Sequence, residues 1–495
     1  MITNLEKTPE SRGISSRALL GFVRKLDKKK IPMHSLLIAR GDDIVLNAYW
    51  SPFDNKTLHR QNSVTKSFVA LAIGLLEEEG KISLDDKVIK FFPEADEYKV
   101  PKEIAEQTVK ELLTMQTVYS PHGERHWVKY KEYDRIRSYF EDCVIKPHGT
   151  LFAYDSRASH ILGIIVERLT GKPFLEYLKE KILLKIGFSE NSDCIKDAFG
   201  YSWADSGLLC TAEDLFRVAK FIRDGGVWEG ERLMNEAFLR TATSRLTSNC
   251  TGGNDRANNA YGYGYQIWHE RHGGFGFHGM GMQYMICIPK LDFTLVCTAD
   301  TQGNDAARAI FLDMYEDFLD EELFNDPLPE DASAYSELME YCKGLKLTSL
   351  DGAKQTATRD RVNERVINLS PNPMGIKWMK LVFSENEGEL IYENAQGEKR
   401  LCFGLCKNLL SRFPQDGYEN MKLGVSEDGY RHPCATSAAW QDENTFVIKS
   451  VMTGNHLGSM YIRIGFSGNN VAVAMSKTPN YFLDEYNGTA IGKIL

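Results

Sequence analysis

Apolar residues recur with a helical period near the start of the chain and with a period of two soon after it. Residues 14–29 predict an amphipathic helix whose apolar stripe is Leu19, Leu20, Phe22, Val23 and Leu26. Residues 35–40 and 43–50 predict two strands joined by a short turn at Gly41-Asp42, which is the pattern of a hairpin.

The stretch from Asn62 to Gly80 predicts a helix of another kind. Its residues from Phe68 to Leu76 leave no polar face, so we expect the helix to be buried all round. Its first turn nevertheless carries Ser63 and Lys66, which are three residues apart and therefore lie on one face of the helix. A buried helix with such a start is unusual unless these groups have a chemical role.

The segments that follow complete the pattern of one domain. Helices are predicted at 108–115, 161–170, 174–184, after Thr211 and at 305–323, and strands at 263–268, 282–288 and 293–299. Because the strands come from both ends of this region and the helices lie between, we expect an α+β fold with an antiparallel sheet flanked by helices and an all-α subregion. Two stretches lack periodicity: 118–150, rich in aromatic residues and histidine, is either a surface insertion or a functional lid, and 246–259 is a loop.

A change in the pattern of residues, from helices to short strands and turns, marks a second domain. The run Asn325-Asp-Pro-Leu-Pro-Glu-Asp is typical of a linker, and a helix over 334–343 follows it. Short strands then alternate with turns at 394–397, 442–444 and 467–470, which predicts an antiparallel β-barrel or sandwich. We therefore divide the chain into a domain over 1–325, a linker and helix over 326–345, and a β domain over 346–495.

Composition narrows the class of protein. A length of 495 residues favours two or three domains, and 43% apolar with 26% charged residues is typical of a globular protein. The formal net charge of −9 argues against nucleic acid or an anionic membrane as a partner. No apolar run is long enough to span a bilayer, and the first residues lack the pattern of a signal peptide, so we expect a cytoplasmic protein. The ten cysteines form no Cys-x-x-Cys pair and are interpreted as reduced core residues.

Ser63 and Lys66 are candidates for nucleophilic catalysis. A serine hydroxyl is a weak nucleophile until a base takes its proton, and the helix N-terminus and burial both favour a neutral lysine. The same N-terminus supplies backbone N–H groups for half of an oxyanion hole. The simpler alternative is that Ser63 caps the helix and Lys66 is a surface lysine.

Two further segments offer partners for this pair. Tyr154, two residues before Ser156, precedes an apolar helix and is either a proton shuttle or an ordinary core tyrosine. The run Phe277-His-Gly-Met-Gly-Met-Gln-Tyr begins a strand whose glycines allow a backbone to approach a ligand closely. The three histidines His269, His272 and His278 raise zinc as an alternative, but strand geometry and the lack of paired carboxylates argue against a metal site.

Taken together, Ser63-Val-Thr-Lys66, Tyr154-Asp-Ser156 and His278-Gly279 resemble the three motifs of the serine β-lactamase and penicillin-binding-protein superfamily. The closer similarity is to its class C β-lactamase-related branch of esterases, peptidases and amide hydrolases. The resemblance extends over most of residues 9–320. The C-terminal strands resemble the lipocalin-like barrel that some members carry, which can wall the active site or mediate association.

The resemblance implies a role for each motif. Ser63 is expected to be the acylated nucleophile, Lys66 its activating partner and Tyr154 the general base and acid. Ser156 stands where the family often has Asn, and His278-Gly279-Met280 stands where it commonly has Lys-Thr-Gly. These departures argue against β-lactam turnover. The oxyanion hole is expected from the N–H of Ser63 and that of Met280 or Gly281.

We therefore expect a serine hydrolase that cleaves a small ester, amide or peptide through an acyl-Ser63 intermediate, without cofactor or metal. A homo-oligomer is compatible with this expectation. Two alternatives remain open: a penicillin-recognising D-amino-acid peptidase or β-lactamase, and a binding or sensor protein that keeps the fold without catalysis.

Overall fold

The computed structural model describes residues 7–119, 134–250, 261–415, 431–478 and 483–495. The chain forms two compact units: Met1–Thr301 with Asp305–Leu345, and Gln302–Asn304 with Lys346–Leu495. The predicted lid or insertion over 118–150 lies partly outside the described residues, as does the predicted loop over 246–259. Among the helices of the described residues, none is both long and apolar enough to cross a membrane.

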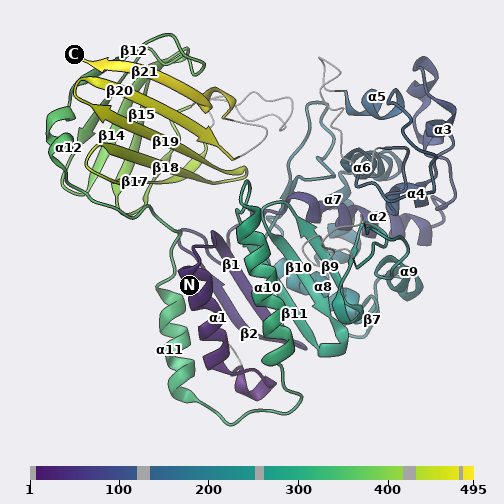
Figure 1. The fold of residues 1–495 in the computed structure, drawn as a ribbon. Helices are drawn as coiled ribbons and strands as arrows, with labels where there is room; N and C mark the ends of the chain where they lie inside the picture. Colours follow the sequence, from purple (N-terminus) through teal and green to yellow (C-terminus); the bar gives the residue numbers. More distant parts are fainter. Residues whose placement is uncertain (1–6, 120–133, 251–260, 416–430, 479–482) are drawn as a thin grey trace. The chain divides into compact units, whose positions relative to one another are not determined.

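The first unit is built on an antiparallel sheet of six strands in the order β2-β1-β11-β10-β9-β8 (Figure 1). The predicted sheet from both ends of the domain is confirmed, since β1 pairs with β2 on one side and with β11 on the other. The strands are β1 (Met33–Arg40), β2 (Asp43–Tyr49), β8 (Trp268–His269), β9 (Phe275–Gly279), β10 (Gln283–Ile288) and β11 (Phe293–Ala299).

The prediction of a strand over residues 263–268 is wrong for most of its length. Of residues 263–268, only Trp268 belongs to a strand, and Gln266 has a φ of 53°. A left-handed residue cannot continue an extended strand, so the backbone turns before β8 begins.

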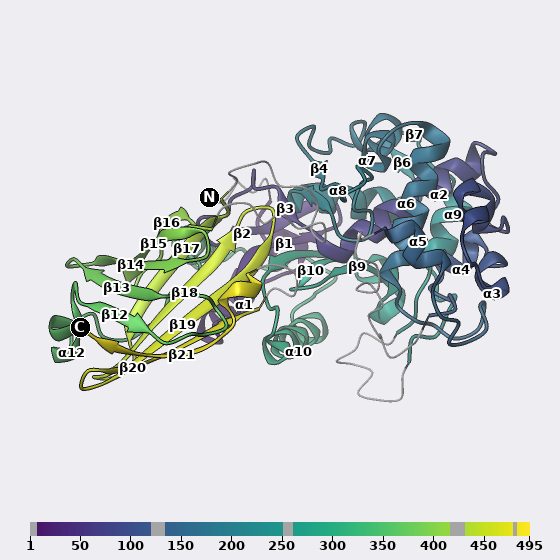
Figure 2. The ribbon, with the colours of Figure 1, turned by 90° about the horizontal axis from the view of Figure 1, so that it is seen from above.

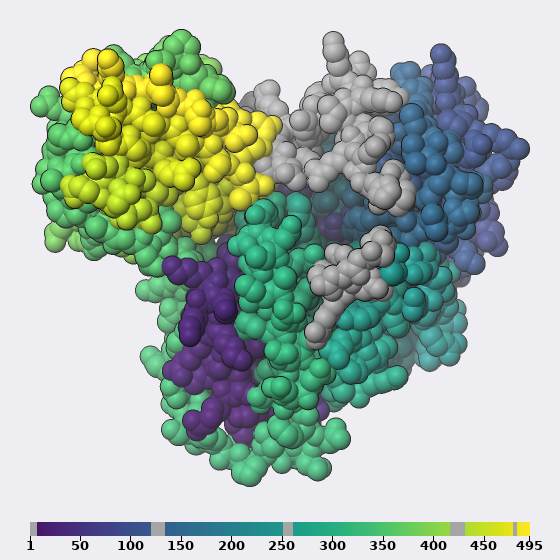
Figure 3. Space-filling view, in the orientation of Figure 1, coloured from purple at the N-terminus to yellow at the C-terminus, as the bar shows by residue number. Residues whose placement is uncertain are grey.

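Helices cover both faces of the sheet because successive strand residues point to opposite sides. One face packs against α1 (Ser16–Lys28), α10 (Asp305–Glu321) and α11 (Ala332–Lys343). Helix α1 begins where the Ser15 hydroxyl accepts the N–H of Arg17, and its Phe22 meets Phe311 of α10 edge to face at 6.2 Å. Figure 3 shows α1 and α10 side by side on the surface of this unit.

The other face packs against the helix that the sequence singles out. Helix α2 (Thr65–Glu78) is buried from Thr65 to Leu76, so the prediction of a helix buried all round is confirmed. Each large apolar side chain in such a position contributes about 1.5–3 kcal/mol to folding. Helices α6 (Ser156–Thr170), α7 (Phe174–Leu178) and α8 (Ala212–Arg223) pack with α2 in the same core.

Shorter elements complete the helical subregion that Figures 1 and 2 show beside α2 and α6. The helices are α3 (Lys102–Ala105), α4 (Val109–Leu113), α5 (Arg135–Phe140), α9 (Glu236–Ala242) and the π-helical turn η6 (Lys179–Leu183). A small sheet has the order β3-β5-β4, with β3 (His59–Arg60), β4 (Asp193–Cys194) and β5 (Leu208–Cys210), and β6 (Val227–Trp228) pairs with β7 (Glu231–Arg232).

The described residues of the second unit form a closed barrel of nine strands, which confirms the predicted barrel (Figure 2). Strands pair in the order β15-β14-β13-β12-β21-β20-β19-β18-β17, and a parallel pairing of Gly404 with Ser437 closes the ring. The strands are β12 (Val366–Leu369), β13 (Trp378–Phe383), β14 (Glu387–Asn394), β15 (Gly397–Leu405), β17 (Pro433–Trp440), β18 (Thr445–Thr453), β19 (Leu457–Ser467), β20 (Asn470–Lys477) and β21 (Gly488–Ile494), with β16 (Leu409–Arg412) added beside β17 and α12 (Ala357–Val362) before β12.

Candidate active site

Ser63 and Lys66 meet at the head of α2. Ser63 lies in a single 3-10 turn, η2 (Asn62–Val64), that leads directly into the helix, and Lys66 is the second residue of α2. Lys66 Nζ donates a hydrogen bond of 3.0 Å to Ser63 Oγ. Lys66 is only 1% exposed whereas Ser63 is half-buried, so the hydroxyl is accessible and the amine beneath it is covered. The burial of Lys66 contradicts the alternative that it is a surface lysine.

The turn before α2 is held by side-chain and backbone hydrogen bonds. Asn62 has a φ of 48°, a conformation that asparagine tolerates better than most residues, and its Nδ2 donates to the carbonyl of Met280 at 2.8 Å. Thr65 Oγ1 donates to the carbonyl of Asn62 at 2.6 Å and accepts the N–H of Leu208 at 3.0 Å. These contacts fix the segment that carries Ser63 between β9 and β5.

Lys66 has a second acceptor on the loop before β5. Its Nζ donates to the backbone carbonyl of Asp205 at 2.7 Å. The amine therefore bridges the candidate nucleophile and a fixed main-chain oxygen. A lysine held in this way has its nitrogen directed at Ser63 rather than free to rotate.

Tyr154 lies on the segment that enters α6, with its ring beside the lysine. Lys66 Nζ is 5.1 Å from the centroid of the Tyr154 ring. The ring stacks on Trp268 at 5.7 Å with an interplanar angle of 26°, and it meets the edge of Tyr263 at 6.4 Å. Burial raises the pKa of Tyr263 well above its ordinary value, so this second tyrosine stays protonated. The structure thus brings Tyr154 to the Ser63–Lys66 pair.

Ser156 is the first residue of α6 and is half-buried. The residue before it, Asp155, caps the helix by accepting the N–H of Arg157 at 3.0 Å. This cap fixes the start of α6, and with it the backbone of Ser156, two residues after Tyr154 in the sequence.

The end of β9 lies against the head of α2 because Gly279 has no side chain. A Cβ added at Gly279 would sit 2.2 Å from the carbonyl oxygen of Gln61, which no real side chain tolerates. The turn that follows contains Met280, which is 40% exposed, and Gly281, which has a φ of +82°. The backbone at Gly279 is thus brought close to Gln61, two residues before Ser63, while the oxyanion hole stays a prediction.

His278 points to a different set of partners. Its Nε2 lies at an ion-pair distance of 2.6 Å from Glu270 Oε1, and its ring stacks on Trp268 at 5.4 Å and 13°. Gly276 leaves room for this pair, since a Cβ there would sit 2.5 Å from Glu270 Oε1. Trp268 consequently lies between the rings of Tyr154 and His278, a link that the sequence did not predict.

The three histidines that raised zinc do not meet. His269 Nδ1 lies 3.4 Å from the carbonyl of Thr243, and His272 lies 4.0 Å from Asp320. Within the described ranges no group of three His, Cys, Asp or Glu side chains is arranged to hold a metal ion.

A buried polar cluster lies near Lys66 and consists of Arg135, His160, Asp197 and Asp205. Arg135 Nη1 donates to Asp205 Oδ1 at 3.0 Å and lies 3.5 Å from His160 Nδ1, while His160 Nε2 lies 3.0 Å from Asp197 Oδ2. Burial opposes ionisation of Asp197, but the contact with His160, the charge of Arg135 and the Phe199 N–H together outweigh this and lower the pKa of the carboxyl. No sequence motif marks these residues, because they come from four separate segments.

Comparison with known proteins identifies the family of the chain. The family model described as Beta-lactamase matches residues 21–313, which is more than half of the chain, so the chain belongs to the beta-lactamase family. This confirms the superfamily that the three motifs resemble.

The sequence identity between the chain and individual relatives is low. The chain is 26% identical over 225 residues to a 6-aminohexanoate-dimer hydrolase of Paenarthrobacter ureafaciens, which covers 42% of this chain and 56% of the relative. The matched part thus spans little more than half of that relative. A putative 6-aminohexanoate-dimer hydrolase from Bacillus anthracis has a similar structure, with a TM-score of 0.53, 20% identity and coverage of 63% of this chain and 85% of that one. A putative beta-lactamase from Bacteroides dorei DSM 17855 gives a TM-score of 0.51 at 17% identity, covering 62% and 100%.

Proposed function

We propose that the protein is a serine hydrolase that cleaves an ester or amide through an acyl intermediate on Ser63. The observation that carries this proposal is the position of Lys66 Nζ, 3.0 Å from Ser63 Oγ and 5.1 Å from the Tyr154 ring centroid. A hydroxyl becomes a good nucleophile when a neighbouring group accepts its proton. Lys66 Nζ lies within hydrogen-bond distance of this hydroxyl, and the Tyr154 ring lies beside that amine.

The proposed reaction has two stages. Ser63 Oγ attacks the substrate carbonyl carbon while its proton passes to Lys66 or Tyr154. The tetrahedral intermediate then breaks the bond to the leaving group, which takes a proton from Tyr154 and leaves the acyl group on Ser63. In the second stage a water molecule gives a proton to Tyr154 and attacks the acyl carbon. The new tetrahedral intermediate then breaks its bond to Ser63 Oγ, which takes a proton back from the group that first accepted it, and the acid is released.

Backbone groups are assigned to the oxyanion. The N–H of Ser63 lies in the first turn of its helix, where N–H groups have no intrahelical acceptor. Of the two candidates on the opposite segment we favour Met280, because it directly follows Gly279, the point of close approach to Gln61. Two such donors aimed at the developing charge are typically worth several kcal/mol, about 3 for one of them. Ser156, at the start of α6, is assigned to substrate contact.

A substrate panel tests the proposal. We expect the wild type to hydrolyse 4-nitrophenyl butyrate, or the linear amide named for the Paenarthrobacter relative, the 6-aminohexanoate dimer. The variant Ser63→Ala should lose at least about 10³-fold in kcat/KM. Equal rates in the two proteins would contradict the proposal.

The same panel separates the alternatives. Turnover of nitrocefin or of a D-alanyl-D-alanine peptide in preference to the simple ester would favour a β-lactamase or peptidase. Neither turnover nor acylation with any of these compounds would favour a binding protein.

A further inference from the structure

The carbonyl of Asp205 determines where Lys66 Nζ points. A lysine amine sits on a flexible four-carbon stem, so its direction is set by the acceptors that it meets. Here the two acceptors are Ser63 Oγ at 3.0 Å and the Asp205 carbonyl at 2.7 Å. Because misplacement of a reacting group by about 1 Å can cost 10²-fold in rate, whatever holds this carbonyl matters for catalysis.

The peptide group of Asp205 is held through the side chain of the same residue. Arg135 Nη1 donates to Asp205 Oδ1 at 3.0 Å, and Ser206 Oγ donates to Oδ2 at 3.2 Å. Arg60 Nε donates to the Ser206 carbonyl at 3.0 Å on the following peptide. Asp205 is only 4% exposed, so its carboxylate depends on these partners rather than on water.

Besides the Asp205 carboxylate, the Arg135 guanidinium contacts a tryptophan ring and a histidine. Its guanidinium lies over the Trp203 ring at 4.6 Å and within 3.5 Å of His160 Nδ1. His160 is fully buried and contacts Asp197 through its other nitrogen at 3.0 Å. Arg135 is the first residue of α5, so this short helix places a cation behind a site formed by α2 and the segment before β5.

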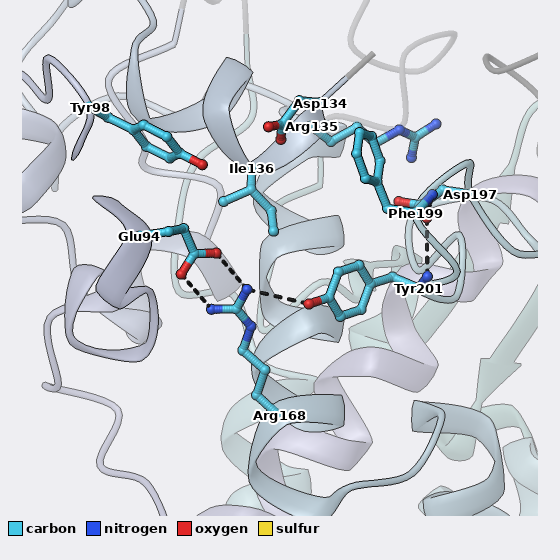
Figure 4. A pocket seen from close by; sticks show the side chains of 9 residues that line it. All are labelled: Glu94, Tyr98, Asp134, Arg135, Ile136, Arg168, Asp197, Phe199 and Tyr201. Carbon is cyan, nitrogen blue, oxygen red and sulfur yellow. Dashed lines mark hydrogen bonds and ion pairs between the residues drawn. The ribbon is translucent and has the colours of Figure 1, made fainter. Parts of the chain in front are cut away.

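A cavity of about 320 Å³ lies on the far side of this cluster. Arg135 and Asp197 line it together with the aromatic rings of Tyr98, Phe199 and Tyr201 (Figure 4). On the opposite wall Arg168 pairs with Glu94 and donates to Tyr201 Oη at 3.3 Å, so this second arginine has no part in the contacts to Asp205. Because Arg135 lines this cavity, replacement of its side chain by that of alanine would leave a space that opens into the cavity.

We propose that Arg135 is a positioning residue for the candidate catalytic lysine, acting through the Asp205 carboxylate to hold the Asp205 carbonyl against Lys66 Nζ. Without the guanidinium, a buried carboxylate loses its cation and the loop turns it towards another partner, which carries the carbonyl away from Lys66. The inference rests on the proposed function, because it concerns the rate of the Ser63 reaction.

Chemical rescue tests this inference with 4-nitrophenyl butyrate as the substrate. Arg135→Ala is expected to lower kcat at least tenfold with KM changed less than twofold. Addition of 20 mM guanidinium chloride should restore kcat at least fivefold in this variant, whereas 20 mM sodium chloride should not. Arg168→Ala, which removes an arginine from the other wall of the same cavity, should keep kcat within twofold of the wild type.

Each other result has a defined meaning. A folded Arg135→Ala variant with wild-type kcat, or with a low kcat that guanidinium does not raise, overturns the inference. If that variant does not fold, Asp205→Asn takes its place, since it keeps the carbonyl and removes the carboxylate: a tenfold loss in kcat supports the inference and a wild-type kcat overturns it. Failure of the proposed function is seen separately, as the absence of Ser63-dependent turnover in the wild type.

Discussion

Lys66 Nζ donates to the backbone carbonyl of Asp205 at 2.7 Å, across 139 residues of sequence. The same nitrogen donates to Ser63 Oγ at 3.0 Å. The candidate nucleophile is therefore linked through one amine to a main-chain oxygen on the loop before β5. This relationship makes Lys66 a residue whose replacement should lower the rate while the nucleophile itself remains in place.

Replacement of Lys66 should reduce turnover without loss of the fold. Lys66→Gln keeps a donor of similar length but removes one of the two proposed proton acceptors, so kcat should fall by about 10²–10⁴-fold. The measurement is steady-state hydrolysis of 4-nitrophenyl butyrate. Lys179→Gln is the matched control, because Lys179 is also buried and also donates to a backbone carbonyl, that of Ser192 at 2.6 Å. A similar loss of kcat in both variants would assign Lys66 a structural role only.

Tyr154→Phe should keep the aromatic packing and lose the proton shuttle. The ring remains able to stack on Trp268, which lies at 5.7 Å in the wild type, so the thermal unfolding temperature should change little. Removal of the hydroxyl should lower kcat by about 10²–10⁴-fold. The neighbouring Tyr263→Phe is the control and should retain most of the activity; an unchanged rate in Tyr154→Phe would exclude Tyr154 as the general base.

Gly279→Ala should disturb the site from the side of β9. The new Cβ would meet the Gln61 carbonyl oxygen at 2.2 Å, a backbone atom that cannot rotate away, so β9 and the turn before α2 must separate. We expect kcat/KM to fall at least about tenfold, in line with the loss of one oxyanion donor. Gly21→Ala in α1 has open space around its Cβ and should be neutral or stabilising, by up to about 1 kcal/mol. Equal activity in the two variants would contradict the assigned approach of β9.

Acid should destabilise the first unit through His59. Its Nε2 lies 2.6 Å from His34 Nδ1, and burial lowers its pKa to about 4. The unfolded chain therefore binds more protons than the folded one between pH 6.5 and pH 4, and stability is lost as the pH falls through that window. Between pH 7 and pH 5 this histidine should cost about 2 kcal/mol of unfolding free energy.

Urea unfolding at pH 7 and pH 5 measures this effect. His59→Gln should show a shallower dependence on pH than the wild type, whatever its stability at pH 7. An identical pH dependence in the two proteins would show that His59 titrates normally in the folded state.

The elements that sequence periodicity predicted correctly are those with local signals. The α2 helix follows from an unbroken apolar run, and the hairpin turn at 394–397 follows from its turn residues, which the pairing of Asn394 with Gly397 confirms. Strand β17 has no comparable local signal, because Pro433-Cys-Ala-Thr-Ser-Ala-Ala-Trp contains small residues that lack a strand preference of their own. Its place in the barrel depends on pairing with β18 and β15, which a local pattern does not report.

The candidate site likewise contains one part that local sequence spacing predicts and another that only the fold brings together. Ser63 and Lys66 are three residues apart, so helix geometry alone brings them together. The contact of Lys66 with Asp205 uses a backbone carbonyl, which every residue type possesses, and so leaves no mark in the sequence. Arg135 and His160 reach the cluster from separate helices, and only the packed fold brings them to Asp205.

The most direct test of the central claim is the mass of the Ser63 peptide after brief incubation with a fluorophosphonate, a reagent that labels activated serine hydroxyls. We expect the wild-type peptide to gain the mass of one phosphonyl group, and Ser63→Ala to gain none anywhere in the chain. Labelling of the alanine variant to the same extent, or an unlabelled Ser63 in a folded wild-type protein, would contradict it.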